Sequence, residues 1–525
     1  MSTLPEFRNE PMTDFSKPEE KAAMELAIAK VLGEVGREHP LVIGGERITG
    51  LKTYDSINPA HKDQILGKFQ KGTREHVEQA IDRAWTAFES WKRESVDVRA
   101  GVLLKAAKLL RERKHEFSAV MVLEVGKTWA EADGDTAEAI DFLEFYAREA
   151  YRYGGEQPIT KIEGEDNEMV YIPLGVGAVI PPWNFPLAIM AGMTTAAIVS
   201  GNCVVLKPSS DSPWIAYRFI ELLEESGMPA GVVNFVSGSG GEVGDPLIQH
   251  PRIRFISFTG SMEVGLHINA EAAKHREGQL WIKRVVAEMG GKDAIIIDRE
   301  TGNLEEAAAA AVASAFGFQG QKCSACSRLI IDDAVYDQVV PMVVEKTKKL
   351  RIGDPTSPEF AVGPVVNEKA MKAIKGYIEK GTKEGGRLVA GGTEVELPGE
   401  GFYVAPTVIA DVAPDATIAQ EEIFGPVLAI IRAKDFDDAL RIANNTLFGL
   451  TGALFSDNEA KLERARDEFF VGNLYFNRKC TGALVGVHPF GGFNMSGTDS
   501  KAGGRDYLGL FLQAKSISRK VAKGK

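Results

Sequence analysis

Apolar residues in the first part of the chain recur with the spacing of amphipathic helices. In residues 75–92, five of them fall at i, i+3, i+4, i+7 and i+11 and therefore lie on one helix face: Val77, Ala80, Ile81, Ala84 and Phe88. Similar patterns predict helices over about 18–35, 98–113, 115–124 and 133–151. A strand pattern at 41–48 (LVIGGERI) contains a Gly-Gly pair that indicates a turn.

The pattern changes from Gly175 onward, where short apolar runs alternate with helical segments. The runs lie at 175–180, 203–208, 232–236 and 254–258, and the helices between them at 187–200, 213–227 and 242–249. A second series of this kind begins near residue 294, includes helices over 304–316 and 334–350, and continues to about 475. Strands separated by helices indicate parallel sheets, so we expect two α/β domains.

Two segments belong to neither series. Residues 155–173 have the pattern of a hairpin with a polar turn, and the tail after about residue 505 alternates as a strand does. Strands without a sheet of their own need partners for their edges, which suggests a subunit interface. The alternative is that both segments extend the main sheets.

Composition narrows the class of protein. Of 525 residues, 44% are apolar and 26% charged, which is ordinary globular usage. The net charge of −12 argues against nucleic-acid binding. The N-terminus lacks the features of a signal peptide, and the longest apolar stretch, Leu187 to Val199, is too short to span a membrane. Only four cysteines are present, so we expect a cytoplasmic enzyme without disulfides.

Two glycine-rich turns follow strands in the first series. Residues 238–244 and 260–265 each connect an apolar run to a helix, and exposed N–H groups in such turns suit a pyrophosphate. The dinucleotide fingerprint G-x-G-x-x-G fails, however, because its last position counted from Gly238 is Val243. Taken alone, these turns fit a cofactor site and ordinary tight turns equally well.

Cys323, in the string FGFQGQKCSACSR, is a candidate nucleophile. A neighbouring cation such as Lys322 would favour the thiolate. The alternative is a redox or zinc pair with Cys326, but zinc needs further ligands, which neither Cys203 nor Cys480 supplies at matching spacing. No histidine has a context that suggests a cysteine hydrolase, and we expect no metal.

Glu288 is the candidate base. It ends an apolar strand (RVVAE) shortly before Gly290 and Gly291, and a carboxylate at such a turn can reach into a cleft. The alternative is a surface glutamate at a strand end, which is the commoner case.

Seven strings in order identify a family resemblance. They are PPWNFP (181–186), LKPS (206–209), FTGS (258–261), EMGGK (288–292), FQGQKC (318–323), EEIFGPV (421–427) and PFGG (489–492). Together they resemble the aldehyde dehydrogenase superfamily over about residues 40–515. The resemblance implies an α/β fold with two open parallel-sheet domains, one Rossmann-like for the cofactor and one catalytic, and a small β-flap for oligomerisation. It implies an NAD-binding domain over 1–154 and 174–289, a catalytic domain over 290–490, and a flap over 155–173 and 505–525 in a homo-oligomer.

The resemblance also implies roles for single residues. Cys323 matches the nucleophile, Glu288 the base, and Asn184 the amide that forms an oxyanion hole with the backbone N–H of Cys323. The cofactor is NAD. Lys207 and Trp183 match positions beside the adenosine ribose, Ser261 beside the pyrophosphate, and Glu422 and Phe424 beside the nicotinamide ribose. The other matched cofactor positions are Ile180, Pro182, Ser209, Gly240, Gly244, Phe258, Thr259, Gly260 and Gly290.

Within the superfamily, the sequence is most similar to bacterial 1-pyrroline-5-carboxylate dehydrogenases that carry this single activity. The similarity rests on Cys323-Ser324-Ala325 and on residues 481–504. It implies that Ser324, Gly482 and Ala483 hold the carboxylate of the substrate and that Phe185 and Phe490 line its aliphatic part. The implied reaction is NAD-dependent oxidation of L-glutamate γ-semialdehyde to L-glutamate in proline degradation, downstream of a separate proline dehydrogenase.

One position departs from the family pattern. Many NAD-preferring relatives carry Glu where this chain has Ser210, so some use of NADP stays open. Two other functions also stay open at this point: a dehydrogenase of another aldehyde, and a thiol esterase or acyl transferase that uses the same Cys and Glu without redox chemistry.

Overall fold

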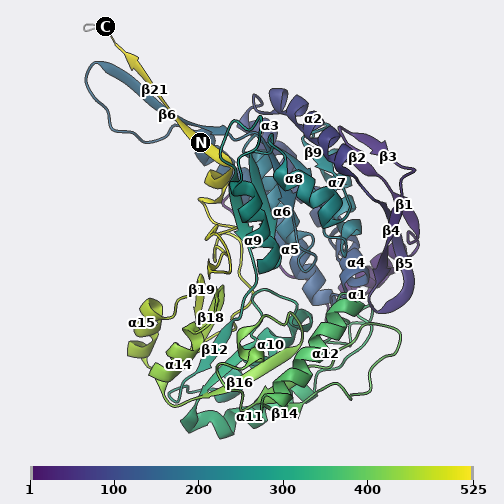
Figure 1. Cartoon of the computed structure of the whole chain (residues 1–525), viewed down its shortest axis with the longest axis vertical. Helices are drawn as coiled ribbons and strands as arrows, with labels where there is room; N and C mark the ends of the chain where they lie inside the picture. The colour runs from purple at the N-terminus through teal and green to yellow at the C-terminus, as the bar shows by residue number, and fades with distance from the viewer. Residues whose placement is uncertain (1–3, 522–525) are drawn as a thin grey trace.

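The computed structural model describes residues 4–521 and shows two lobes, each built on a seven-stranded sheet (Figure 1). The sheet of the first lobe has the order β11-β10-β7-β8-β9-β2-β3. Its strands are β2 (Leu41–Ile43), β3 (Glu46–Ile48), β7 (Val176–Ile180), β8 (Cys203–Leu206), β9 (Val233–Phe235), β10 (Phe255–Thr259) and β11 (Arg284–Glu288). The strands from β11 to β9 are parallel, whereas β2 and β3 add antiparallel strands at one edge.

Helices cover both faces of this sheet. They are α1 (Pro18–Leu32), α2 (Arg74–Trp91), α3 (Val96–Glu112), α4 (Lys114–Val125), α5 (Trp129–Gly154), α6 (Ala188–Val199), α7 (Pro213–Glu225), α8 (Asp245–Gln249) and α9 (Met262–Ala273), with a π-turn at Gly240–Gly244. The five apolar residues predicted to share a face of α2 are all buried, which confirms that prediction. Helix α6 is buried along almost its whole length, as its continuous apolar sequence requires.

The sheet of the second lobe has the order β14-β15-β16-β13-β12-β18-β19, and only β14 is antiparallel to its neighbour. Its strands are β12 (Ala294–Ile297), β13 (Arg328–Asp332), β14 (Arg387–Ala390), β15 (Thr407–Ala410), β16 (Val427–Ala433), β18 (Thr451–Phe455) and β19 (Asn473–Phe476). Helices α10 (Leu304–Phe316), α11 (Asp333–Lys348), α12 (Glu368–Lys383), α13 (Thr417–Gln420), α14 (Phe436–Asn444) and α15 (Glu459–Glu468) accompany it. Alternate residues of the central strands enter two separate apolar cores, one on each face, as the period-2 geometry of strands dictates.

Strands β6 (Glu165–Pro173) and β21 (Leu512–Lys520) form a two-stranded antiparallel sheet that projects from the first lobe (Figure 1). The predicted hairpin over 155–173 is therefore wrong, because only 165–173 is a strand and its partner is the tail. The alternative that both segments extend the main sheets is also wrong. Residues 1–3 and 522–525, included in the predicted NAD-binding domain and flap, lie outside the described residues.

Two smaller sheets were not foreseen. Strands β1 (Arg37–His39), β4 (Thr53–Asn58) and β5 (His61–Gln70) form a three-stranded sheet beside the first lobe. Strands β17 (Phe448–Gly449) and β20 (Phe493–Asn494) pair near the junction of the lobes. The 3-10 turns Gly317–Gly320 and Tyr507–Phe511 complete the regular structure.

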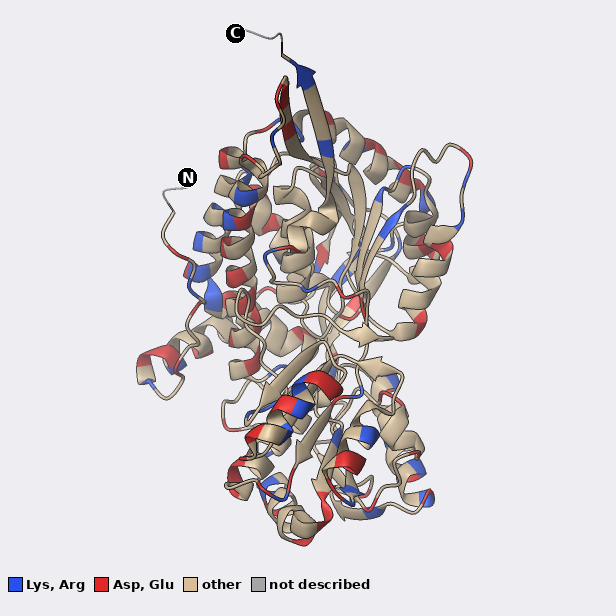
Figure 2. Ribbon diagram, turned by 90° about the vertical axis from the view of Figure 1, so that its left-hand side faces the viewer, with Lys and Arg blue, Asp and Glu red and all other residues tan. Residues whose placement is uncertain are grey.

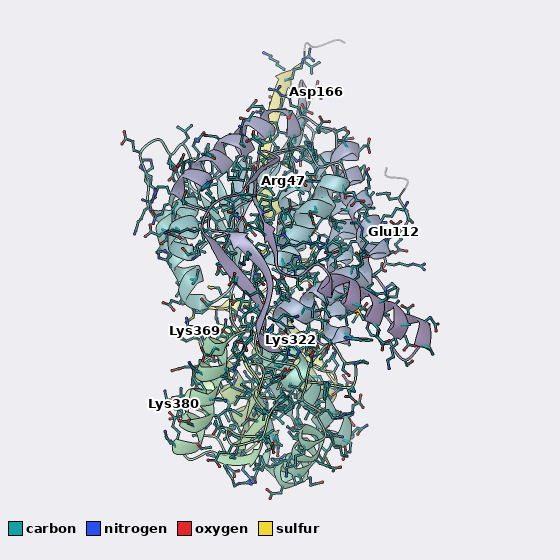
Figure 3. The ribbon with its side chains drawn as sticks, turned by 90° about the vertical axis from the view of Figure 1, so that its right-hand side faces the viewer. Arg47, Glu112, Asp166, Lys322, Lys369 and Lys380 are labelled. Carbon is teal, nitrogen blue, oxygen red and sulfur yellow. The ribbon has the colours of Figure 1, made fainter. Side chains whose placement is uncertain are left out.

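The lobes meet at a narrow waist, where Lys322 lies, whereas Asp166 lies far away on the projecting strand pair (Figure 3). Charged residues lie mainly on the outer helices of both lobes (Figure 2). Among residues 4–521, no helix combines the length and apolar character needed to cross a membrane.

Candidate active site

The turn that leads to Cys323 has an unusual backbone. Phe318 and Gln319 have positive φ angles of 48° and 56°. Residues other than glycine rarely adopt such angles, which cost about 1–3 kcal/mol each and occur mainly at functional sites. The side-chain amide of Gln319 holds the turn by donating to the carbonyls of Gly126 at 3.0 Å and Pro364 at 2.7 Å. The surrounding structure thus fixes the position of Cys323, a residue of intermediate exposure.

Asn184 lies against this same turn. It follows β7 in the string PPWNFP and is only 4% exposed. Its Nδ2 donates to the backbone carbonyl of Gln321 at 3.1 Å. The side chain of Gln321 accepts a hydrogen bond from the backbone N–H of Val366 at 2.9 Å, which anchors the turn on the second lobe. The Asn184 side chain is therefore hydrogen-bonded to the residue that lies two positions before Cys323 in the chain.

Glu288 is the last residue of β11 and is covered by a late segment of the chain. Gly497 pairs with it in an isolated β-bridge, and its carboxylate accepts from the backbone N–H of Gly492 at 3.2 Å and from the hydroxyl of Ser500. Burial raises the pKa of Glu288 to about 7. A carboxyl group that titrates near neutrality can exchange protons at physiological pH, as a general base must.

The charges around Cys323 differ from the sequence-based hypothesis. The Nζ of Lys322 binds the carboxylate of Glu131 at 2.7 Å. Burial raises the pKa of the Cys323 thiol well above its usual value, and nearby carboxylates, Asp293 first among them, raise it further. The hypothesis that Lys322 favours the thiolate is therefore wrong. Because its surroundings oppose ionisation of the thiol, we expect Cys323 to need a base to react.

The predicted cofactor residues of the first lobe gather at the carboxyl ends of its parallel strands. Lys207 and Ser209 follow β8, Ile180 ends β7 and Thr259 ends β10. Pro182 follows β7, Phe258 belongs to β10, Gly260 follows it, and Gly240 and Gly244 bound the π-turn after β9. This edge of an open parallel sheet is where ligands bind in α/β proteins.

The chemistry of this edge fits an anionic dinucleotide. Burial lowers the pKa of Lys207 to about 8, and its stem passes 3.7 Å from the space that a Cβ on Gly244 would occupy. Around Gly240 that space is open to 4 Å. Ser261 caps the N-terminus of α9 by accepting from Val264 N–H at 3.4 Å, and helix N-termini attract phosphate groups.

Residues of both lobes meet beside Cys323 at the proposed nicotinamide end. Glu422 accepts from the backbone N–H of Gly291 at 2.9 Å, and a Cβ on Gly290 would collide with its carboxylate. The ring of Phe424 packs edge-on against Trp183 with centroids 5.5 Å apart. A small opening lies here, lined among others by Gly291, Lys322, Glu422 and Phe424.

The predicted carboxylate-binding residues come from two segments that touch. The carbonyl of Ser324 accepts a hydrogen bond from the thiol of Cys480 at 3.4 Å, which ties the Cys323 loop to the segment containing Gly482 and Ala483. Gly482 has a φ of +80°, a conformation that favours glycine.

The two predicted aromatic residues, Phe185 and Phe490, are held in different ways. Phe490 pairs with Ala502 through backbone hydrogen bonds. The ring of Phe185 lies 4.1 Å from the buried ammonium group of Lys127, which also forms an ion pair with Asp135 at 2.7 Å. Sequence reasoning missed Lys127 and Asp135, because nothing in their local sequence marks them.

No group of three or more His, Cys, Asp or Glu side chains within residues 4–521 is arranged to hold a metal ion. Cys326 and Cys480 are buried free thiols, and Cys203 is buried inside β8, as its strand sequence suggested.

A model of the aldehyde dehydrogenase family matches residues 47–517. The chain belongs to the aldehyde dehydrogenase family. The family and the fold class predicted from the sequence are thereby confirmed.

Full-length relatives refine this similarity. The chain is 57% identical over 512 residues to a 1-pyrroline-5-carboxylate dehydrogenase of Geobacillus sp. (strain WCH70), covering 98% of this chain and 99% of the relative. A crystal structure of 1-pyrroline-5-carboxylate dehydrogenase from Thermus with bound NAD is 49% identical, with a TM-score of 0.97 over 99% of this chain and 100% of that chain. Proline utilization A from Bdellovibrio bacteriovorus is 44% identical with a TM-score of 0.97, covering 100% of this chain and 54% of that one.

Proposed function

We propose that this protein oxidises L-glutamate γ-semialdehyde, formed when the ring of 1-pyrroline-5-carboxylate opens, to L-glutamate with NAD. The observation that carries the proposal is the convergence of Cys323, Glu288 and Asn184 on the junction of the lobes. Near-complete alignment with relatives that are named 1-pyrroline-5-carboxylate dehydrogenase supports the choice of substrate.

The reaction begins at Cys323. Its thiol proton passes to the carboxylate of Glu288 and from there to solvent, its sulfur forms a bond to the aldehyde carbon, and the carbonyl oxygen becomes an oxyanion. The Nδ2 of Asn184 and the backbone N–H of Cys323 are the donors we assign to that oxygen. Removing one such donor typically lowers the rate about 10²–10³-fold.

NAD, when bound, supplies the hydride acceptor that converts the sulfur adduct into a thioester. Lys207, Ser261 and the turn at 240–244 would hold its adenosine and pyrophosphate end, and Glu422 with Phe424 its nicotinamide end. The protein then has to hydrolyse the thioester. Glu288 takes a proton from a water molecule, the water oxygen bonds to the acyl carbon, and the Cys323 sulfur leaves and is reprotonated.

The remaining predictions are part of the same proposal. We infer that Ser324, Gly482 and Ala483 bind the α-carboxylate and that Phe185 and Phe490 contact the methylene groups. We infer an NAD-binding domain over 1–154 and 174–289, a catalytic domain over 290–490, and a flap over 155–173 and 505–525 that joins subunits of a homo-oligomer. Four free thiols support a reducing cytoplasm, and a separate proline dehydrogenase would produce the substrate.

NADH formation with 1-pyrroline-5-carboxylate, measured with NAD and with NADP, tests the proposal. Cys323→Ala should abolish NADH formation. Glu288→Gln should slow NADH release in the first turnover, because the thiol loses its proton acceptor, and should lower the steady-state rate about 10²–10⁴-fold. Cys203→Ala, which changes a buried thiol away from the turn, is the control and should remain active. A higher kcat/KM for succinic semialdehyde than for glutamate semialdehyde would contradict the substrate assignment.

A further inference from the structure

Residues 4–17 form an arm that crosses the outside of the first lobe before α1 begins (Figure 2). The arm has no helix or strand between residues 4 and 17, yet it is held at several points. The backbone N–H and hydroxyl of Thr13 donate to Asp133 on α5 at 2.8 and 2.5 Å, and Lys114 donates to the carbonyl of Pro11 at 2.9 Å. The arm is therefore part of the folded lobe.

Asn9 connects this arm to a segment nearly five hundred residues later. Its Nδ2 donates to Asp141 Oδ2 on α5 at 2.8 Å and to the backbone carbonyl of Val485 at 3.0 Å. The other carboxylate oxygen of Asp141 accepts from the backbone N–H of Glu10 at 2.6 Å. One amide group thus joins three elements: the arm, α5 and the segment around Val485.

Apolar contacts reinforce this junction. The rings of Phe7 and Phe145 pack edge-on with centroids 5.2 Å apart. Gly486 lies directly on this pair, since a Cβ added there would come within 3.0 Å of Phe145 and 3.2 Å of Phe7. Gly486 also has a φ of +76°, so the segment turns sharply where the arm supports it.

The supported segment includes the residues assigned to the substrate carboxylate. Val485 follows Ala483 by two positions and Gly482 by three, and residues 481–484 form no helix or strand of their own. Backbone N–H groups bind an anion well only if the loop already holds them in place. When a binding-competent loop conformation is populated only in part, the apparent Kd rises in proportion.

We propose that Asn9 is a positioning residue for substrate binding: by holding the carbonyl of Val485 against α5, it keeps the backbone N–H groups of Gly482 and Ala483 in place for the substrate carboxylate. This inference rests on the proposed function, which assigns those N–H groups to the carboxylate. Asn9 does not touch the reacting atoms and acts only through the loop.

Steady-state kinetics of the full-length enzyme tests this role. Asn9→Ala should raise the KM for glutamate semialdehyde about three- to tenfold, the effect of one ordinary hydrogen bond. The kcat and the KM for NAD should stay within about twofold, because Cys323 and the cofactor edge are not involved. The KM for hexanal, which has no carboxylate, should also be unchanged.

Two further variants separate positioning from folding. Asn9→Asp keeps the side-chain shape but removes both donors, so it should raise the same KM at least as much. Thr13→Ala loosens the arm on α5 without touching the 482–486 segment, so it should leave the KM unchanged.

Three results would overturn the inference. They are an unchanged KM for glutamate semialdehyde in Asn9→Ala, an equal rise in Thr13→Ala, and an equal rise in the KM for hexanal. Failure of the proposed function is recognised separately, because the unmodified enzyme would then not prefer glutamate semialdehyde over hexanal.

Discussion

At the scale of single residues, we expect the environment of Glu288, the proposed base, to determine how the rate depends on pH. Its pKa of about 7 means that the base is protonated, and turnover slow, on the acidic side of neutrality. The Ser500 hydroxyl donates to the carboxylate and favours its charged form. Ser500→Ala should therefore raise the pKa of Glu288 and move the acidic limb of the kcat–pH profile upward by about one pH unit.

A neighbouring substitution controls this prediction. Thr498 donates and accepts hydrogen bonds at the backbone of Ala287, one residue before Glu288, and does not touch the carboxylate. Thr498→Val should leave the acidic limb in place. If it shifts the limb as far as Ser500→Ala does, the position of the segment rather than the serine hydroxyl sets the pKa.

We expect the residue at position 210 to influence the choice between NAD and NADP. It is exposed just beyond β8, where a carboxylate would repel a 2′-phosphate. Ser210→Glu should raise the ratio of kcat/KM for NAD to that for NADP by about tenfold or more. Ser90→Glu, on the exposed side of α2, adds the same charge elsewhere and should leave the ratio as it is. An unchanged ratio in Ser210→Glu would show that this position does not face the ribose.

Local strings made Cys323, Glu288 and Asn184 predictable as candidates, because each stands in a short motif. The partners that tune them were not predictable. Ser500 lies 212 positions from Glu288, and only folding brings them together. The misjudged role of Lys322 has the same cause, since its partner Glu131 lies 191 positions earlier in the chain.

At the scale of elements, the buried pair of Lys127 and Asp135 links the end of α4 to the start of α6. Asp135 Oδ1 accepts from Ala188 N–H at 2.6 Å while Oδ2 binds Lys127, and neither side chain reaches solvent. Lys127→Ala would leave a buried carboxylate without its cation and should lower the free energy of unfolding by about 3–5 kcal/mol in urea titrations. The double variant Lys127→Met/Asp135→Asn should recover much of that loss. A loss in the double variant as large as in Lys127→Ala would point to packing instead of charge.

Elements with strong local periodicity were predicted well, and those defined by distant pairing were not. Helix α10 spans Leu304–Phe316, the predicted range. Strand β6 was taken for half of a local hairpin, although its partner β21 lies more than three hundred residues later. The sheet of β1, β4 and β5 was missed because β4 and β5 are largely polar and bulged, so no clear alternation marks them.

At the scale of the whole molecule, the β6–β21 sheet has too few contacts with the rest of the chain to be stable by itself. A two-stranded sheet is marginal in water, and this one extends away from the first lobe with Ile172 and Ile517 both 36% exposed (Figure 1). A second subunit can cover the exposed apolar residues and can form hydrogen bonds with the open strand edges. The projecting sheet, with its exposed isoleucines and open edges, therefore supports the proposed homo-oligomer.

Removal of β21 tests that argument on the assembled protein. A chain that ends at Phe511 keeps the 3-10 turn that packs on the first lobe and loses the strand, so its mass by light scattering should fall toward that of a single chain. Leu26→Asp changes another exposed apolar residue, 72% exposed on α1, and should leave the mass of the assembly unchanged. Subunits join elsewhere if the shortened chain keeps the full mass. Because β21 is far from Cys323, a shortened chain that stays folded should retain the first-turnover release of NADH even as a monomer, which separates assembly from chemistry.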